Sequence, residues 1–326
     1  MILVTGATGF LGAEVCKQLL ANGQTKLRAI KRPTSDLFYL KEVENQIEWV
    51  DADLLDIPAL EKAFEGVTHV YHCAAVISFV PKQWDWMHRV NVGGTKHIVN
   101  LCLDAGVEKL IHVSSIAAIG RTKNQQLINE ETEWDADSPY NSAYGKSKYA
   151  AEMEVWRAVA EGLDAVIVNP SMIVGPIKWN IGTGRFFTTI QQGFRFYTDG
   201  TNGIVDVSDV AKAMLELMKS NITAERFIIS SENWHLRSLM NEIAQYLNKP
   251  LPNKKVTPLI AAVAWRWEAL KSKFTGNEPL LTKETLQNAM VHSKYDNTKV
   301  KKALGFEFSP VKETIARTAK AFLAEQ

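Results

Sequence analysis

The sequence is short of cysteine, of unbalanced charge and of long apolar runs. Only three cysteines occur in 326 residues, Cys16, Cys73 and Cys102, and none belongs to a C-x-x-C pair. This pattern argues against a disulfide framework or a thiolate metal site, so we expect buried, reduced thiols in a cytoplasmic protein. The formal net charge is only +1, which predicts no basic surface for nucleic acid or for an anionic membrane.

Membrane-spanning segments and metal-ligand spacings are also missing. The longest apolar run near the carboxyl end covers residues 259–265, far short of the ~20 residues that cross a bilayer. The predicted fold begins at residue 2, so we expect no signal peptide. His69 and His72 lie three apart on an expected strand, where they face opposite sides. We therefore expect no membrane span and no metal site.

What remains is the composition of a large globular protein. Apolar residues make up 46% of the chain and charged residues 22%, and the length suits one large or two coupled domains. The first 23 residues then read as a buried strand (2–4), a turn with glycines at 6, 9 and 12, and a helix. In this context Gly6 allows the tight turn, Gly9 leaves room for a pyrophosphate, and Gly12 lets the helix pack on the strand.

The spacing T-G-x-x-G-x-x-G resembles the short-chain dehydrogenase/reductase superfamily, and TGATGFLG is similar to the form in its extended branch. The resemblance implies an α/β fold with a Rossmann-type, doubly wound parallel sheet. It also implies that the glycine turn binds a nicotinamide cofactor. The residues of this turn that we assign to the cofactor are Thr5, Gly6, Thr8, Gly9, Phe10, Leu11 and Gly12.

The end of the second expected strand (26–30) indicates which cofactor fits. Lys31 and Arg32 stand where an acidic residue would bind the ribose of NAD, and the first carboxylate is Asp36. A basic side chain there can pair with the 2′-phosphate of NADP or stack on adenine. We therefore expect NADP(H), with NAD(H) as the alternative; a solvated basic turn is the structural alternative for these two residues.

Three further segments carry expected cofactor contacts. Asp53, followed by Leu54 after the third strand, resembles the adenine-contacting acid of the family. Capping of the helix at 57–64 is the alternative, and one residue can fill both roles. Ala74 and Ala75 follow the fourth strand in a segment that resembles the family's strand-four motif, which implies that they leave space for the backbone to pass under the adenine and ribose. Asn91 resembles the asparagine that holds the active-site framework of the family, and a local helix contact is the alternative.

The catalytic residues are expected after the fifth strand (109–113). Ser115 follows this strand, and Tyr144 and Lys148 lie four apart on one face of a later helix. A tyrosine with its usual pKa of ~10 exchanges protons poorly at neutral pH, so we expect the Lys148 ammonium and the positive nicotinamide ring to lower that pKa. Tyr144 is then the general acid, Ser115 orients the substrate oxygen, and Lys148 also holds the ribose.

The segment after the sixth strand resembles the Pro-x-x-(Ile/Val)-x-Gly-Pro motif of the family, with Pro170 and Ile173 beside the nicotinamide. The usual arginine before this proline is replaced by Asn169. We expect the substrate between Ser78-Phe79, the 121–140 loop and the 177–203 segment. Trp179 and Phe186 in the last of these suggest an apolar or ring-bearing substrate, or else a covered core.

The whole chain then divides into two parts. We expect residues 1–176 to form the NADP-binding domain, with 204–231 returning to it and Ser208 or Asp209 capping a helix there. Residues 177–203 and 232–326 would form a smaller, mainly helical substrate lobe. By resemblance, helices at 92–104 and 145–160 would pair in a homodimer.

The motifs are most similar to the dihydroflavonol-reductase-like and hydroxysteroid-dehydrogenase-like group of the superfamily. They imply an NADPH-dependent reductase of an aldehyde or ketone, reversible as an alcohol dehydrogenase. One alternative is an NAD-dependent nucleotide-sugar epimerase or dehydratase, for which Arg185 and Arg195 are the only diphosphate-binding candidates in 177–203. Another is a non-catalytic NADP-sensing protein, since fold alone does not fix function.

Overall fold

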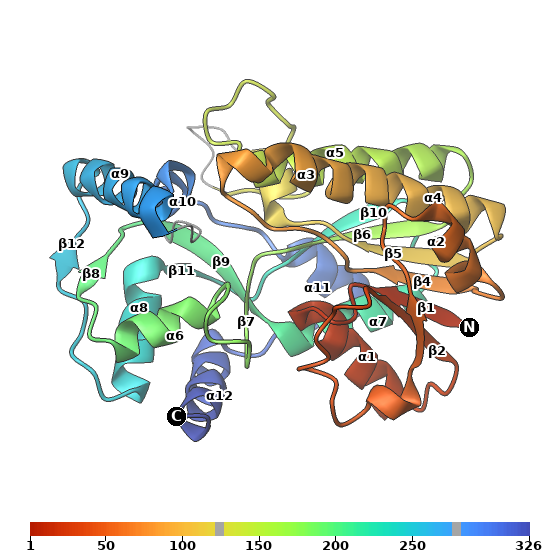
Figure 1. Cartoon of the computed structure of the whole chain (residues 1–326), viewed down its shortest axis with the longest axis horizontal. Coiled ribbons are helices and arrows are strands. Elements are labelled where there is room, and N and C mark those ends of the chain that lie inside the picture. The colour runs from red at the N-terminus through yellow and green to blue at the C-terminus, as the bar shows by residue number, and fades with distance from the viewer. Residues whose placement is uncertain (121–126, 276–281) are drawn as a thin grey trace.

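The computed structural model of the chain describes residues 1–120, 127–275 and 282–326 and contains two lobes (Figure 1). The larger lobe is built on a seven-stranded parallel sheet with the order β10-β6-β5-β4-β1-β2-β3. Its strands are β1 (Ile2–Thr5), β2 (Leu27–Lys31), β3 (Glu48–Asp51), β4 (His69–His72), β5 (Lys109–Val113), β6 (Ala165–Pro170) and β10 (Glu225–Ile229). The expected fold class is confirmed, with strand ends within two residues of those predicted.

Helices cover both faces of this sheet because alternate strand residues point to opposite sides. Leu3 and Val70 pack in one core with α2 (Ile57–Phe64), α4 (Gly94–Asp104) and α5 (Ala143–Ala160). Val4 and Tyr71 pack in the other core with α1 (Phe10–Ala21) and α7 (Val207–Lys219). A sheet covered in this way leaves the carboxyl ends of its strands open as the place for a ligand.

The smaller lobe combines two short sheets with helices around its own core. Its sheets have the orders β11-β9-β7 and β12-β8. The strands are β7 (Met172–Val174), β8 (Phe196–Tyr197), β9 (Thr201–Asp206), β11 (Glu232–His235) and β12 (Lys254–Lys255). The helices are α6 (Gly184–Gln191), α8 (Leu236–Tyr246), α9 (Pro258–Thr275), α10 (Lys283–Asn288) and α12 (Val311–Ala324).

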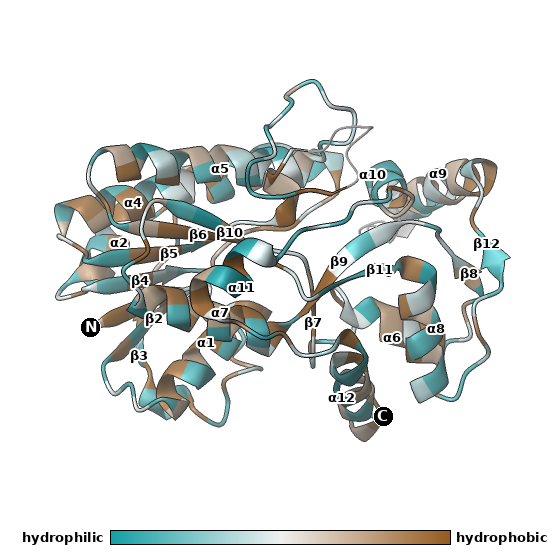
Figure 2. Ribbon diagram, turned by 180° about the vertical axis from the view of Figure 1, so that it is seen from behind, coloured by the Kyte–Doolittle hydropathy of each residue, from teal (hydrophilic) through white to brown (hydrophobic). Residues whose placement is uncertain are grey.

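The boundary between the lobes differs from the expected one. Strand β9 pairs with β7 and β11 in the smaller lobe's sheet, whereas α7 and β10 pack in the larger lobe. Helix α11 (Thr298–Leu304) packs on β10 and α7 (Figure 2), and its Val300 shares a core with Val4. The carboxyl-terminal part of the chain therefore contributes to both lobes.

Helix capping also differs from the expectation. The N-cap of α7 is Asp206, whose carboxylate accepts a hydrogen bond from the Ser208 N–H at 2.8 Å. Asp209 instead accepts from the Ser309 N–H at 2.7 Å, which ties the segment before α12 to α7. A residue with extended backbone just before a helix can turn its side chain onto the free N–H groups of the first turn. Asp206 has this conformation.

Within the described ranges, none of the helices has the length and hydrophobicity of a bilayer-spanning segment. The same ranges contain no cluster of three or more histidine, cysteine or acidic side chains arranged to hold a metal ion.

Candidate active site

The glycine turn is packed so tightly that two of its glycines cannot be replaced without movement. Gly6 has a φ of +69°, and a Cβ there would lie 2.6 Å from the Ala74 nitrogen. A Cβ on Gly12 would lie 2.2 Å from the Gly6 carbonyl oxygen. Helix α1 begins after Gly9 without any capping side chain. Its first N–H groups therefore have no acceptor within the helix, an arrangement that fits the pyrophosphate of a dinucleotide.

Thr5 supports this turn from inside the protein. Its side chain is fully buried, and its hydroxyl lies 2.6 Å from His72 Nδ1. The Ala74 N–H also donates to the Thr5 hydroxyl, at 3.3 Å. On the other side of the ring, His72 Nε2 lies 3.0 Å from the Thr95 hydroxyl. Thr5 thus fixes the residues around the turn through buried hydrogen bonds.

Lys31 and Arg32, at and just after the end of β2, differ in whether they have a partner in the structure. The Lys31 ammonium forms an ion pair with Asp51 at the end of β3, with a distance of 2.7 Å. The Arg32 guanidinium is exposed and has no hydrogen-bond or ion-pair partner among the described residues. Asp53 accepts from the Leu55 N–H, while Asp56 is the N-cap of α2, so capping by Asp53 was wrong. Arg32 is the cation that remains available to a ligand here.

The other predicted cofactor-binding residues gather at the same edge of the sheet. Thr8 and Leu11 belong to the glycine turn and α1, and the Phe10 ring packs on Tyr39 with centroids 6.0 Å apart. The rest follow strand ends or lie beside them: Leu54 against Gly94, Ala74 and Ala75 after β4, Pro170 at the end of β6, and Ile173 on β7.

Ser115 and Tyr144 meet where β5 ends and α5 begins. Ser115 caps a short turn at Ile116–Ala118, and its hydroxyl accepts from the Ala117 N–H at 3.1 Å. Tyr144 lies in the first turn of α5, near enough to the Ser115 side chain for that side chain to act on the pKa of its phenol. Gly145 permits this approach, because a Cβ there would lie 2.6 Å from the Ala117 carbonyl oxygen. The predicted pair is therefore brought together by close backbone packing.

Lys148 lies one turn further along α5, and its ammonium donates to the Val113 carbonyl at 2.8 Å. Burial lowers the pKa of Lys148 to about 8, although the nearby Glu152 carboxylate opposes that shift. Burial also raises the pKa of Tyr144 to about 12, and the Ser115 hydrogen bond acts in the lowering direction. Desolvation of the phenol therefore outweighs the Ser115 contact in the chain alone.

Asn91 holds the framework of the site, as the family resemblance suggested. It lies in a π-helical turn (Arg89–Gly93) between α3 (Trp84–His88) and α4. Its amide exchanges two hydrogen bonds with the backbone of Val76, at 2.7 and 2.9 Å, and donates to the Ser147 hydroxyl at 3.0 Å. Ser147 in turn donates to the Tyr144 carbonyl at 2.8 Å. The interpretation of Asn91 as a local helix contact was wrong.

The predicted substrate residues separate into two groups. Phe79 lies edge-on to Tyr144 with ring centroids 6.1 Å apart, and the adjacent Ser78 is buried. Trp179 instead packs on Phe322 of α12, with centroids 5.0 Å apart, and Phe186 packs against the same core. The structure therefore supports the core interpretation for Trp179 and Phe186. Residues 121–126 of the predicted substrate loop lie outside the described residues.

Several residues that support the site were missed in the sequence. The buried Glu152 accepts hydrogen bonds from the residues next to Ser115, and Arg226 of β10 pairs with it. One signal was present, because Glu152 lies four residues after Lys148 and so shares its helix face. Arg226 carried no local signal, since only the parallel pairing of β10 with β6 brings it near.

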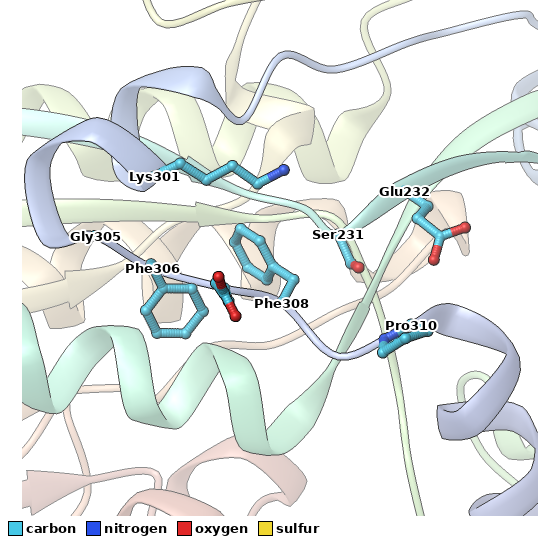
Figure 3. Close-up of a pocket in the computed structure, with 8 residues that line it drawn as sticks. Ser231, Glu232, Lys301, Gly305, Phe306, Phe308 and Pro310 are labelled. Atoms are coloured by element: carbon cyan, nitrogen blue, oxygen red, sulfur yellow. The ribbon is translucent and has the colours of Figure 1, made fainter.

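A separate surface concavity lies away from these residues (Figure 3). Neither Ser115 nor Tyr144 nor Lys148 contributes to it. It is lined by Ser231, Glu232, Lys301, Gly305, Phe306, Glu307, Phe308 and Pro310. The concavity is therefore distinct from the place where Ser115, Tyr144 and Lys148 lie.

Comparison with known proteins identifies the family of the chain. A model of the NAD dependent epimerase/dehydratase family matches residues 2–229, which contain the glycine turn, Ser115, Tyr144 and Lys148. The chain belongs to this family. It is accordingly an NAD(P)-dependent enzyme that acts on carbonyl or alcohol groups.

Individual relatives of this epimerase/dehydratase family member include a putative dihydroflavonol 4-reductase from Synechocystis sp., which is 31% identical over 322 residues. That match covers 96% of this chain and 92% of the relative. Sterol demethylase protein B from Methylococcus capsulatus is 32% identical over 277 residues, which cover 83% of this chain and 82% of the relative. The solved structure of gox2253 has a TM-score of 0.85 at 32% identity, and the match covers 100% of this chain and 98% of that one.

Proposed function

We propose that the protein is an NADPH-dependent reductase of an aldehyde or ketone, which also runs in reverse as an alcohol dehydrogenase. The observation that carries this proposal is the meeting of Ser115, Tyr144 and Lys148 beside the carboxyl end of β5. The three side chains supply a hydrogen-bond donor, a proton donor and a cation within two turns of one helix and the adjacent loop. A protein that only sensed the cofactor would have no use for the buried acid.

Each residue has a distinct role in this proposal. When bound, the reduced nicotinamide supplies a hydride to the carbonyl carbon. Ser115 donates a hydrogen bond to the carbonyl oxygen and orients it, and Tyr144 donates the proton that completes the alcohol. Lys148 holds the ribose and stabilises the negative charge left on Tyr144. General acid assistance of this kind contributes ~10²–10⁴ in rate.

The cofactor preference rests on Arg32. Its guanidinium is free to form a bidentate pair with the 2′-phosphate, while Lys31 is neutralised by Asp51. The N-terminus of α1 and Gly9 would receive the pyrophosphate, and Ala74 leaves space for the adenosine half. NAD(H) remains the alternative, since the same turn suits both dinucleotides.

The substrate is proposed to be apolar or ring-bearing. The ring of Phe79 stands edge-on beside Tyr144 and offers an apolar wall next to the reacting carbonyl. The names of two relatives, a dihydroflavonol reductase and a sterol demethylase protein, point to compounds with fused rings. Simple aromatic aldehydes and cyclic ketones are therefore the first compounds to assay.

The direct test is Tyr144→Phe, which keeps the ring and removes the acid. We expect a fall in kcat of ~10²–10⁴-fold with NADPH affinity unchanged. Tyr149→Phe is the matched control, because Tyr149 lies on the same helix but stacks on Trp134, with centroids 4.3 Å apart. Full activity in Tyr144→Phe, measured as NADPH oxidation with the best carbonyl substrate, would contradict the mechanism.

A further inference from the structure

A fully buried carboxylate lies directly behind the catalytic serine. Glu152 of α5 has no exposed surface, yet four donors from four parts of the chain converge on it. Its Oε2 accepts from the Ser114 hydroxyl at 2.8 Å and from Asn169 Nδ2 at 3.1 Å. Its Oε1 accepts from the Arg226 guanidinium at 3.2 Å and from the Trp156 indole at 3.4 Å. A buried carboxylate held by this many donors is a fixed point in the structure.

Asn169 connects this fixed point to Ser115. Its amide nitrogen donates to the Glu152 carboxylate and also to the Ser115 carbonyl, the second at 3.0 Å. The Ser115 carbonyl accepts a further hydrogen bond from the Ala118 N–H at 2.9 Å. The peptide that follows Ser115 is therefore held from two sides, by its own turn and by the Asn169 amide.

A neutral side chain at position 169 is possible because Arg226, on another strand, supplies the positive charge that Glu152 needs. Arg226 lies on β10, opposite Ile167 of β6, and forms the ion pair with Glu152. A buried carboxylate needs such a cation, since an unpaired one is strongly destabilising. Because Arg226 meets that need, Asn169 can use one N–H for Glu152 and the other for Ser115.

Arg226 also fixes the segment that leads from Ser115 towards Tyr144. Its guanidinium donates to the carbonyl of Glu130, and to the carbonyl of Thr132 at 3.3 Å. The Glu130 carboxylate accepts from the Ile228 N–H at 2.8 Å, which joins the same segment to β10. The Glu152–Arg226 pair thus holds both the serine and the described part of the loop after it.

We propose that Asn169 is a positioning residue for the reaction, which sets the place of Ser115 through the Ser115 carbonyl while Glu152 and Arg226 hold Asn169 in place. This inference rests on the proposed function, in which Ser115 orients the substrate oxygen. Loss of the amide frees the peptide after Ser115 and so moves the Ser115 hydroxyl relative to Tyr144. A displacement of about 1 Å at a reacting group lowers the rate by up to ~10²-fold.

The kinetic test combines substitutions at positions 169 and 115. Asn169→Ser is the sharper variant, because one hydroxyl has one proton to donate and cannot serve Glu152 and Ser115 together. We expect Asn169→Ser and Asn169→Ala each to lower kcat by roughly 10- to 100-fold without a change in NADPH affinity. In a Ser115→Ala background the same substitutions should change kcat by less than about twofold, because the residue through which they act is absent.

Asn297→Ala is the matched control for a lost buried asparagine. Asn297 donates to the carbonyls of Ser230 and Ser231, at 2.6 and 3.0 Å, and touches none of the catalytic residues. We expect it to lower the stability and leave kcat unchanged. An equal loss of kcat from Asn169→Ser in both the native and the Ser115→Ala backgrounds would overturn the proposal, since a purely structural role gives that result.

Amide hydrogen exchange separates this proposal from the proposed function. The Ala117 and Ala118 N–H groups donate to the hydroxyl and the carbonyl of Ser115, so their exchange reports its position without any substrate. Asn169→Ser should speed exchange in the peptide 114–120 by roughly 2- to 10-fold, and Asn297→Ala should not. If the native protein reduces no carbonyl compound, the proposed function fails. Unchanged exchange in Asn169→Ser would overturn the positioning role whether or not the enzyme turns over.

Discussion

The polar residues near the strand ends of the larger lobe and the aromatic residues of the smaller lobe have different roles. In the larger lobe, Ser115 follows β5 and Asn169 lies next to the end of β6, and Asn169 donates hydrogen bonds to the Ser115 carbonyl and to Glu152 of α5. In the smaller lobe, Trp179 packs on Phe187 and Phe322 and builds that lobe's own core. Parallel strands bring their carboxyl ends to one edge, so position along the chain there predicts position in space. Aromatic residues in a connecting segment carry no such constraint.

Helices α5 and α9, both of 18 residues, show the same contrast. Helix α5 buries Lys148 and Glu152 beneath the site. Helix α9 leaves Val263 63% exposed and Trp267 67% exposed. An apolar stripe at helical spacing thus does not by itself show that the stripe faces the core.

The largest effect that sharpens this comparison is expected from a pair of aromatic substitutions. Trp179→Ala should lower the free energy of unfolding towards the upper end of the roughly 0.5–3 kcal/mol range of single substitutions, because it empties part of the smaller lobe's core. Phe79→Ala should change stability little and raise KM for the carbonyl substrate. Denaturant unfolding gives the change in unfolding free energy of each variant, and steady-state kinetics give the change in KM. Equal stability losses, with KM unchanged by Phe79→Ala, would contradict it.

Much of the larger lobe could be predicted from sequence, and the reasons are local. The spacing of Gly6 and Gly12 predicts a tight turn packed against a helix. The spacing of Tyr144 and Lys148 predicts that both lie on one face of a helix. Arg226 could not be predicted in this way, because it reaches Glu152 only through the pairing of β10 with β6. These contacts depend on tertiary packing rather than on any pattern in the chain.

The N-cap of α7 and the position of Trp179 were hard to predict for a similar reason. Asp206 rather than Ser208 caps α7, and the choice between neighbouring polar residues depends on backbone angles that sequence does not reveal. For Trp179 the sequence left both a position near the substrate and a position in the core open. In the structure its indole N–H donates to Glu325, at 2.7 Å, near the end of the chain.

An intermediate effect is expected at the edge of the larger lobe, where Lys31 and Arg32 differ in their partners. Arg32→Ala should weaken NADPH binding by roughly 10- to 100-fold, the range for loss of a hydrogen bond between charged groups, and leave NADH binding unchanged. Lys31→Ala is the comparison, and we expect a smaller loss because Asp51 already pairs with Lys31. Fluorescence titration of Arg32→Ala and Lys31→Ala with NADPH and with NADH gives the four affinities. An equal loss of NADH and NADPH binding in Arg32→Ala would show that Arg32 does not contact the 2′-phosphate.

The smallest effect concerns acid stability, which we attribute to the buried polar side chains of the larger lobe. Burial lowers the pKa of His72 to about 3 and the pKa of His112 well below its usual value. Below pH ~6.5 the unfolded chain binds protons that the folded chain does not, so stability falls as the pH falls. Each buried histidine contributes about 1.4 kcal/mol per pH unit in that range.

His112→Phe isolates one of these contributions, because neither ring nitrogen of His112 has a hydrogen-bond partner. We expect the dependence of unfolding free energy on pH, between pH ~6 and ~4, to decrease by about 1.4 kcal/mol per pH unit. The exposed His88 provides the control, and His88→Phe should leave the slope unchanged. The same slope in His112→Phe and in the native protein would show that His112 is not held neutral.

The central claim is that hydride and proton leave the enzyme in a reduced product, with Tyr144 as the proton donor. The most direct measurement follows deuterium from C4-deuterated NADPH during turnover of an aromatic aldehyde or cyclic ketone. With deuterium at both C4 positions, we expect one deuterium on the former carbonyl carbon for each NADPH oxidised, at a rate ~10²–10⁴-fold lower in Tyr144→Phe. Deuterium that stays with a tightly held cofactor, while a nucleotide sugar is converted without net oxidation, would contradict it and identify an epimerase or dehydratase.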